Sequence, residues 1–442
     1  MAIDLLQITL HKLRKLRYVL KRLHTNTLKP TISNYIVFFL LSIAIVILLL
    51  GSVQNHVFGQ SQPPLSVEQF VALEEAEQLN KKAIDLYNKG RFIEAIPFAK
   101  RSLVITEKVL GKEHLYVAAT LNNLAMLYLE QGNYQQAEPL YQRSLKIKEK
   151  ILGKEHVDIA TALNNLGGLY QAEGSYQQAK TLFLRAQEIR EKALGDSHPL
   201  VANSLNNLAT LYVEQGNYQQ AEPLFQRALS IREKAPGVEN SSLATSLNNL
   251  AGLYLAQGNY QQAELMYQRS LKIYQNALGN SHPLVAVSLN NLGLLYKSQR
   301  NYKQAEYLFQ QALQIRKNVL QDSHPAIANS FNNLALLYKE QNNYQQAQIL
   351  YKKSLSIVEK ELGKEHPNVG TSLNNLAALY VAERKYQQAE PLFQRSLAIF
   401  EKTLGNLHPN VANNLINLAS LYQAKDDIAR ATDYYRRGLD IQ

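Results

Sequence analysis

The stretch Leu205–Leu229 reads LNNLATLYVEQGNYQQAEPLFQRAL and decides the fold. In its first half, apolar residues such as Leu208 and Tyr212 recur at helical spacing and form one apolar stripe. Gly216 accepts the left-handed conformation that ends a helix, and Asn217 fits the N-cap of a following helix. The stretch therefore predicts a helix, a turn and a second helix.

The same pattern returns every 42 residues without a gap. The pentapeptide LNNLA, or a close variant of it, begins at residues 121, 163, 205, 247, 289, 331, 373 and 415. A ninth, degenerate unit opens the array, with Asn80-Lys81 where the other units have an asparagine pair. No stretch shows the alternation typical of a strand, so we expect an all-α chain whose helical hairpins stack into one solenoid.

These residues resemble the tetratricopeptide repeat, here with 42 residues per unit. The longer unit, with its LNNLA, QGNYQQAE and LGxxHPxVA motifs, looks like the kinesin light chain variety, which also occurs in bacterial, notably cyanobacterial, proteins. The resemblance covers residues 73–442. It implies a right-handed superhelical solenoid of about nine repeats, in which the first helix of each repeat lines a concave groove.

One unit departs from the pattern between its second helix and the next repeat. Residues 235–241 read APGVENS and replace the usual Leu-Gly and His-Pro. Because proline cannot continue a helix, Pro236 is expected to end the second helix early. We also expect a local change in superhelix curvature there.

The N-terminal region differs from the repeats in composition. Residues 1–34 form a basic leader, predicted to be cytoplasmic, and residues 35–53 are apolar enough for a transmembrane or signal-anchor helix. Cleavage of the same segment as a signal peptide is the alternative. Residues 54–72 read as a linker. The repeat array is therefore expected to be extracytoplasmic, either membrane-anchored or secreted or periplasmic after cleavage.

Charge and composition exclude several classes of function. The first 60 residues carry +6 of the net charge of +11, so the repeats are too weakly basic to predict nucleic-acid binding. Cysteine is absent, and the chain has none of the phosphate-binding, nucleophile-elbow or zinc-protease motifs. We therefore predict a protein that is not an enzyme, with no catalytic residue, cofactor or metal.

The prediction of a peptide-binding site rests on the asparagine pair. Asparagine is a poor helix former, so an asparagine repeated inside a helix needs a reason. The resemblance implies that the second asparagine of each pair contacts a bound peptide. This role maps to Asn123, Asn165, Asn207, Asn249, Asn291, Asn333, Asn375 and Asn417. The open alternative is that the carboxamides bond to one another or to neighbouring backbone and only stiffen the solenoid.

Two other residue types recur in register. Histidines stand in the loops between repeats, where we expect capping rather than metal binding, because successive repeats hold them apart. They are His114, His156, His198, His282, His324, His366 and His408. Basic residues align on the second helices, where we expect solvation or pairing between repeats, with attraction of an acidic partner as the alternative. They are Arg101, Arg143, Arg185, Arg227, Arg269, Lys353, Arg395 and Arg437.

Together these features predict a membrane-tethered scaffold that binds extended segments of partner proteins in its groove. A structural protein that assembles with copies of itself, or that acts as an envelope spacer, is the alternative. The sequence does not indicate the oligomeric state.

Overall fold

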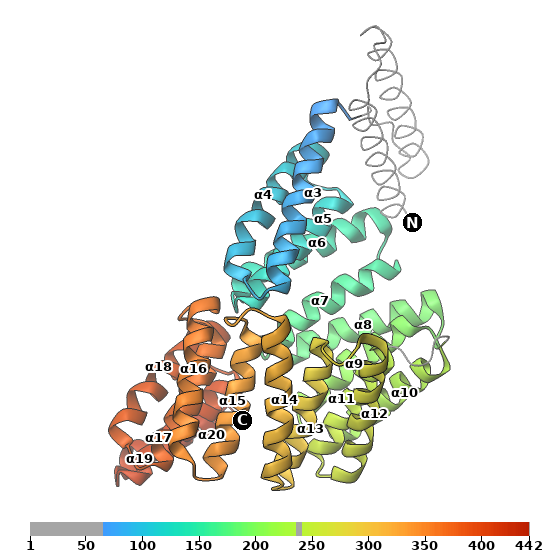
Figure 1. Cartoon of the computed structure of the whole chain (residues 1–442). Helices are drawn as coiled ribbons and strands as arrows, with labels where there is room; N and C mark the ends of the chain where they lie inside the picture. The colour runs from blue at the N-terminus through green and yellow to red at the C-terminus, as the bar shows by residue number, and fades with distance from the viewer. Residues whose placement is uncertain (1–64, 236–240, 442) are drawn as a thin grey trace, which may run out of the picture. The chain divides into compact units, whose positions relative to one another are not determined.

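The computed structural model describes residues 65–235 and 241–441, and all of its described regular elements are helices (Figure 1). The first helices of the nine repeats are α3 (Val67–Asn88), α5 (Leu115–Glu130), α7 (Val157–Ala172), α9 (Pro199–Glu214), α11 (Ser241–Ala256), α13 (Pro283–Ser298), α15 (Pro325–Glu340), α17 (Pro367–Ala382) and α19 (Pro409–Ala424). The second helices are α4 (Phe92–Leu110), α6 (Tyr134–Leu152), α8 (Tyr176–Leu194), α10 (Tyr218–Lys234), α12 (Tyr260–Leu278), α14 (Tyr302–Val319), α16 (Tyr344–Leu362), α18 (Tyr386–Leu404) and α20 (Ile428–Leu439). The prediction of an all-helical tetratricopeptide-type solenoid is confirmed.

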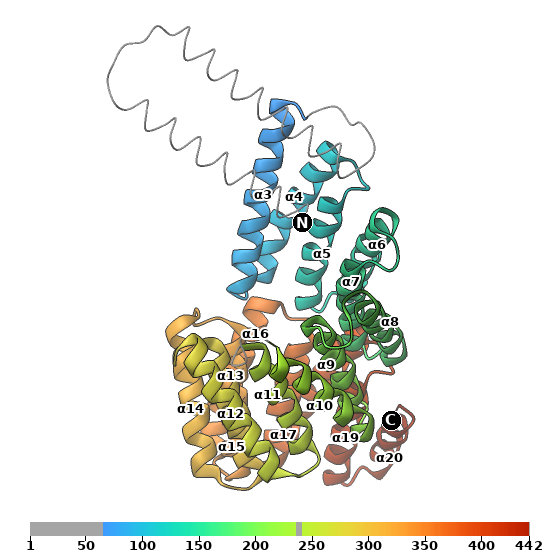
Figure 2. The same cartoon turned by 90° about the vertical axis from the view of Figure 1, so that its right-hand side faces the viewer.

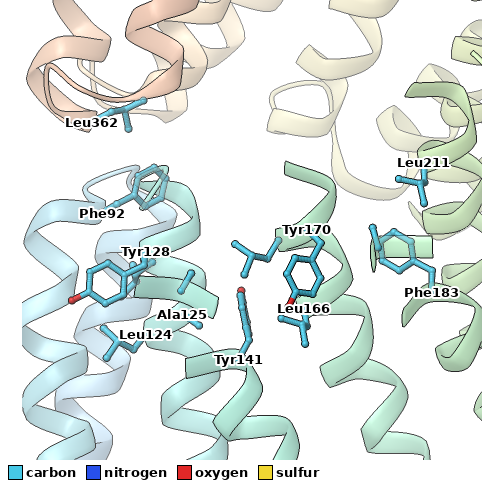
Figure 3. Close-up of a cluster of buried hydrophobic side chains, with 14 of the residues drawn as sticks. Phe92, Leu124, Ala125, Tyr128, Tyr141, Leu166, Tyr170, Phe183, Leu211 and Leu362 are labelled. Carbon is cyan, nitrogen blue, oxygen red and sulfur yellow. The ribbon is translucent and has the colours of Figure 1, made fainter. Parts of the chain in front are cut away.

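The apolar stripes of the two helices in each hairpin form the core. Leu205 and Ala209 on α9 are fully buried, and Phe225 of α10 is buried with them. Figure 3 shows that the core also continues from one hairpin to the next, since Tyr141 of α6 and Leu166 of α7 lie in one cluster. Each hairpin is too small to bury its apolar face alone, so stability comes from stacking on the next one.

The turn inside each hairpin requires a left-handed residue. Gly216 has φ +71° and ends α9, as predicted. In the last four repeats this position is not glycine, and Arg300, for example, has φ +59°. A non-glycine residue in this region costs about 1 to 2 kcal/mol, which the stacking of the helices must offset. The expected cap after this turn forms at Asn133, whose side chain accepts from the backbone N–H of Gln136, whereas Asn217 makes no such bond.

The observed end of α10 and the observed start of α3 can be compared with the boundaries predicted from the sequence. Helix α10 ends at Lys234, so the early stop predicted from Pro236 is confirmed. Residues 236–240 lie outside the described residues, and the change in curvature there stays a prediction. At the other end, α3 begins at Val67, six residues before the expected start of the array at residue 73. Ser66 and Gln69 form a reciprocal capping box that starts the helix early.

The basic leader (1–34), the apolar segment (35–53) and the linker up to residue 64 lie outside the described residues. The membrane helix therefore stays a prediction. In the part of the chain that the structure describes, no helix is long and apolar enough to cross a membrane.

Within residues 75–442, early repeats contact late ones. The turn at Gly132 lies against the start of α17, where a Cβ atom on this glycine would come within 2.5 Å of Cδ of Pro367. Next to it, Nε2 of His366 lies 3.0 Å from the carbonyl oxygen of Glu130. The turns at Gly90 and Gly174 meet the starts of α15 and α19 in the same way. The contact thus recurs at the 42-residue spacing of the repeat.

An apolar contact accompanies this polar one. Helix α16 contacts α4, and Leu362 at the end of α16 belongs to the same buried cluster as Phe92 at the start of α4. Figure 3 shows Leu362 facing Phe92 across the junction, and Figures 1 and 2 both show α16 beside the tips of α3 and α4. The solenoid therefore has a second set of contacts, in addition to those between neighbouring repeats.

Candidate peptide-binding face

The first helices form the inner side of the curved array. Neighbouring first helices contact each other directly, for example α7 with α9, α9 with α11 and α15 with α17, whereas in the described part no neighbouring second helices come as close. In a curved stack the elements on the inner side are the ones that approach each other. The concave face is therefore made by the first helices.

The eight asparagines predicted to bind peptide all lie on this face, one on each first helix from α5 to α19. Every one of them is half-buried. They are Asn123, Asn165, Asn207, Asn249, Asn291, Asn333, Asn375 and Asn417. Their spacing follows the repeat, so they form a row that crosses the helices.

Most of these side chains are linked into a ladder. The second asparagine of one repeat donates Nδ2–H to Oδ1 of the first asparagine of the preceding repeat. The bonds run from Asn123 to Asn80 (3.1 Å), Asn165 to Asn122 (2.8 Å), Asn291 to Asn248 (3.0 Å), Asn333 to Asn290 (2.7 Å), Asn375 to Asn332 (2.9 Å) and Asn417 to Asn374 (3.0 Å). The asparagine pair therefore has a structural role, which was the alternative interpretation of the sequence.

The ladder also explains why the end repeats depart from the pattern. The first repeat, which opens the described part of the chain, has Lys81 in the donor position. It keeps the acceptor Asn80, which Asn123 uses. The last repeat keeps the donor Asn417, which bonds to Asn374, but has Ile416 in the acceptor position. Each end thus keeps only the half of the pair that has a partner.

The ladder is interrupted at two consecutive junctions. Among the described residues, the side chains of Asn207 on α9 and Asn249 on α11 have no hydrogen-bond partner, although every other second asparagine bonds to the preceding repeat. Their expected acceptors, Oδ1 of Asn164 and Oδ1 of Asn206, are buried and have no partner. The N–H group of Asn206 is turned instead to Oγ of Ser246 in the following repeat, at 3.1 Å. The sequence does not predict this gap, because the interrupted repeats have the same LNNLA motif as the others.

The bonded asparagines keep hydrogen-bonding capacity. A carboxamide has two N–H donors and one oxygen acceptor, and the ladder uses one donor of each second asparagine. Its Oδ1 and its other N–H remain for a ligand. Such a pair of groups fits the alternating N–H and C=O groups of an extended backbone.

The residue three positions after each of these asparagines lies one turn further along the same helix face. At this position α7, α9 and α11 have Gly168, Thr210 and Gly252, whereas α13 and α15 have Leu294 and Leu336. A Cβ atom on Gly168 would meet nothing within 4 Å. Small residues therefore line the face over the three repeats that contain the ladder gap, and they return at Ala378 on α17 and Ser420 on α19.

Acidic side chains lie at one edge of this face, at the carboxyl ends of the first helices. Burial raises the pKa of Glu130 at the end of α5. Burial and the nearby Glu138 raise the pKa of Glu173, which follows α7, to about 7. Glu214 ends α9. In the described part of the chain no basic side chain forms an ion pair with Glu130, Glu173 or Glu214, whereas Glu340 on α15 pairs with Lys297 at 3.0 Å.

The histidines cap helices, as predicted. At each of the seven positions Nδ1 accepts the backbone N–H two residues later, for example from Asn368 to His366 at 3.0 Å. His366, and by the same position His324 and His408, also meet a backbone carbonyl of an early repeat. No group of three His, Asp or Glu side chains among the described residues is placed to hold a metal ion.

The basic residues of the second helices pair between repeats. Arg185 contacts Glu149 and Arg227 contacts Glu191, both at 2.7 Å and both between consecutive second helices. The same pairing joins Arg143 to Glu107, Arg269 to Glu233, Arg395 to Glu359 and Arg437 to Glu401. Each exposed pair contributes only about 0 to 1 kcal/mol. The prediction of pairing between repeats is confirmed for these six.

A stack of helical hairpins with an amide-lined inner side defines a repeat protein of the scaffold class. The tetratricopeptide repeat family matches residues 73–150, 158–234, 242–318, 299–360, 326–402 and 368–442, and a second profile of the same repeat matches residues 206–277. The chain belongs to the tetratricopeptide repeat family. Such all-helical solenoids are typically non-enzymatic scaffolds, and the matches include no catalytic family.

Solved structures with a similar fold include a Rap protein complexed with Competence and Sporulation Factor, at 15% identity and a TM-score of 0.55 over 84% of this chain and 98% of that one. The apo quorum sensor NprR from B. thuringiensis is 17% identical, with a TM-score of 0.50 over 83% and 99% of the two chains. A Podosopora anserina protein with kinesin light chain nearly identical TPR-like repeats is 30% identical over 47% of this chain and 97% of that one, with a TM-score of 0.39. No curated protein matches the chain.

Proposed function

We propose that this protein is a non-enzymatic scaffold whose concave face binds an extended segment of a partner protein. The observation that supports the proposal most is the row of half-buried asparagines on the inner helices, each with an unpaired oxygen and an unpaired N–H. Amide groups at regular intervals can bond the backbone of an extended peptide, and side chains beside them select its sequence. The Rap protein, which shares the fold, was solved in complex with a factor.

Replacement of Asn249 and Asn291 by alanine should weaken peptide binding about tenfold while helicity is retained. Both side chains lie on the proposed face, and alanine is a better helix former than asparagine. The measurement is the affinity of the full-length protein for peptides selected from a random twelve-residue library, followed by circular dichroism of the same samples.

The matched control replaces Asn276 and Asn318, which are exposed asparagines on the second helices α12 and α14. This control should bind the selected peptides with unchanged affinity. An affinity that is unchanged by the Asn249 and Asn291 replacements, or that falls equally in the control, would contradict the proposal.

The membrane tether is a further part of the proposal and rests on the apolar segment 35–53 alone. An anchored scaffold would present its concave face to partners on one side of a membrane. N-terminal sequencing of the mature protein tests it, because an anchor keeps Met1 or its neighbour whereas a cleaved signal peptide gives a new terminus after the apolar segment.

Self-assembly is a second candidate function, favoured by the last helix. Helix α20 exposes the apolar side chains of Ile428 (62%) and Leu439 (63%). A second copy could cover this face. Sedimentation that depends on protein concentration, and that persists after replacement of Asn249 and Asn291, would identify this function.

A further inference from the structure

Three features occur together at the two interrupted junctions of the concave face. The carboxamides of Asn207 and Asn249 have no partner, whereas those of the other six second asparagines are bonded to the preceding repeat. The floor beside them is made by small residues. The acidic edge next to them has no paired cation among the described residues, unlike Glu340 further along the array.

The free amides matter because a bonded amide is less available to a ligand. A second asparagine in the ladder is held in one orientation by its neighbour, and a ligand can use only its remaining groups. Asn207 and Asn249 can offer both N–H groups and the oxygen and can rotate to suit the ligand.

The small residues give room for the segment to lie close to the helices. Gly168, Thr210 and Gly252 occupy the positions where Leu294 and Leu336 project in the next two repeats. The nearest atom to a Cβ on Gly252 would be the hydroxyl oxygen of Tyr267, at 3.5 Å, which is ordinary contact. A peptide backbone can therefore approach the carboxamides over α7, α9 and α11 without displacing a large side chain.

The acidic side chains at the edge of the concave face favour a positively charged ligand. Glu130, Glu173 and Glu214 follow one another at the carboxyl ends of α5, α7 and α9. The raised pKa of Glu173, about 7, reflects burial and the proximity of Glu138, and a lysine or arginine at this place would favour the charged carboxylate. A cationic side chain of the partner would supply the counter-ion that the later repeats obtain from Lys297.

We infer that the partner segment is basic and is anchored at repeats 3 to 5, with its backbone bonded by Asn207 and Asn249, its side chains over Gly168, Thr210 and Gly252, and a lysine or arginine beside Glu173 and Glu214. This inference rests on the proposed function and gives its site and ligand class.

The test compares two pairs of variants of the full-length protein. The gap pair is Asn207→Ala with Asn249→Ala, and the ladder pair is Asn291→Ala with Asn333→Ala. The probes are two fluorescein-labelled peptide pools of twelve residues, composed of Ser, Thr, Ala and Leu with either two Lys or two Glu. Binding is followed by fluorescence anisotropy, and the melting temperature of each variant is measured in parallel.

We expect the wild-type protein to bind the lysine pool about tenfold more tightly than the glutamate pool. The gap pair should weaken this binding about 30-fold, as expected from the loss of two hydrogen bonds, with no fall in melting temperature. The ladder pair should weaken binding about threefold or less and lower the melting temperature by about 3 °C, because its bonds hold repeats together. Glu173→Gln with Glu214→Gln should remove the preference for lysine.

The other outcomes separate this inference from the proposed function. If both pairs weaken binding equally, or if only the ladder pair does, the concave face binds peptide but the anchor at repeats 3 to 5 is wrong. A preference for the glutamate pool overturns the assignment of a basic ligand. If neither pair changes the binding of either pool, the proposed function fails together with the inference.

Discussion

Gly132→Ala is expected to destabilise the repeat array by about 2 to 5 kcal/mol, whereas Gly216→Ala costs only about 1 to 2 kcal/mol. The two glycines occupy the same position of their repeats, with φ of +64° and +71°. Alanine is strained to the same extent at both positions, because the backbone is left-handed at each. Only at Gly132 does the new Cβ atom also meet another part of the chain, 2.5 Å from Cδ of Pro367, whereas at Gly216 it meets nothing within 4 Å.

The difference between these variants measures the contact between early and late repeats. Urea unfolding of both variants and of the wild-type protein gives the two changes in the free energy of unfolding. Equal losses would mean that the turn at Gly132 and the start of α17 do not depend on each other in solution. That result would contradict the existence of the second set of contacts, between early and late repeats, in solution.

Acidification is expected to weaken the same contact through His366. This side chain is 7% exposed, and burial lowers its pKa from 6.5 to about 4. Its two nitrogens have different partners, since Nδ1 accepts from the N–H of Asn368 and Nε2 can donate to the oxygen of Glu130. Protonation would place a hydrogen on Nδ1 and remove the helix cap, so the folded protein favours the neutral ring.

The sign of the pH dependence follows from this preference. The pKa of His366 is lower in the folded than in the unfolded protein, so its stabilising effect is complete above pH 6.5 and is lost as the pH falls from 6.5 towards 4. A shift of this size corresponds to a loss on the order of 3 kcal/mol. Burial also lowers the pKa of His324 and of His408 at the two equivalent contacts, which acts in the same direction.

His366→Asn is the matched variant, because asparagine also caps helices but does not titrate. Repeat 5 has asparagine, Asn240, at this position of its sequence. The difference in unfolding free energy between wild type and variant should shrink as the pH falls from 7 to 4. Glu130 is present in both proteins, so the effect of its raised pKa, which acts in the opposite direction, cancels in this difference. An NMR titration that places the pKa of His366 near 6.5 would contradict the account.

Much of the local structure could be predicted from the sequence because it depends on residues close together in the chain. The hairpins, the glycine turns, the histidine caps and the early end of α10 at Lys234 all follow from spacing and backbone conformation. Pairing such as Arg227 with Glu191 could be predicted because both recur at the period of the repeat.

Two features could not be predicted. The contact between Gly132 and Pro367 depends on the small rotation between repeats, which accumulates along the array and is not encoded in any single unit. The gap in the asparagine ladder has no signature in the pair itself, because Asn207 and Asn249 stand in the same LNNLA motif as their bonded equivalents. The direction of the ladder, in contrast, is reflected in the sequence, because Lys81 replaces a donor asparagine and Ile416 replaces an acceptor asparagine. The reason for these two replacements becomes clear only from the observed hydrogen bonds.

The central claim is that the carboxamides of the concave face bind the backbone of an extended peptide, and N-methylation of that backbone tests it most directly. A peptide selected by the full-length protein would be synthesised with one amide nitrogen methylated at a time, and the affinity of each version measured. The account predicts that methylation at alternating positions near the centre of the peptide weakens binding at least about tenfold, since each removes a donor to a carboxamide oxygen. Affinity that is unchanged by methylation at every position would contradict it.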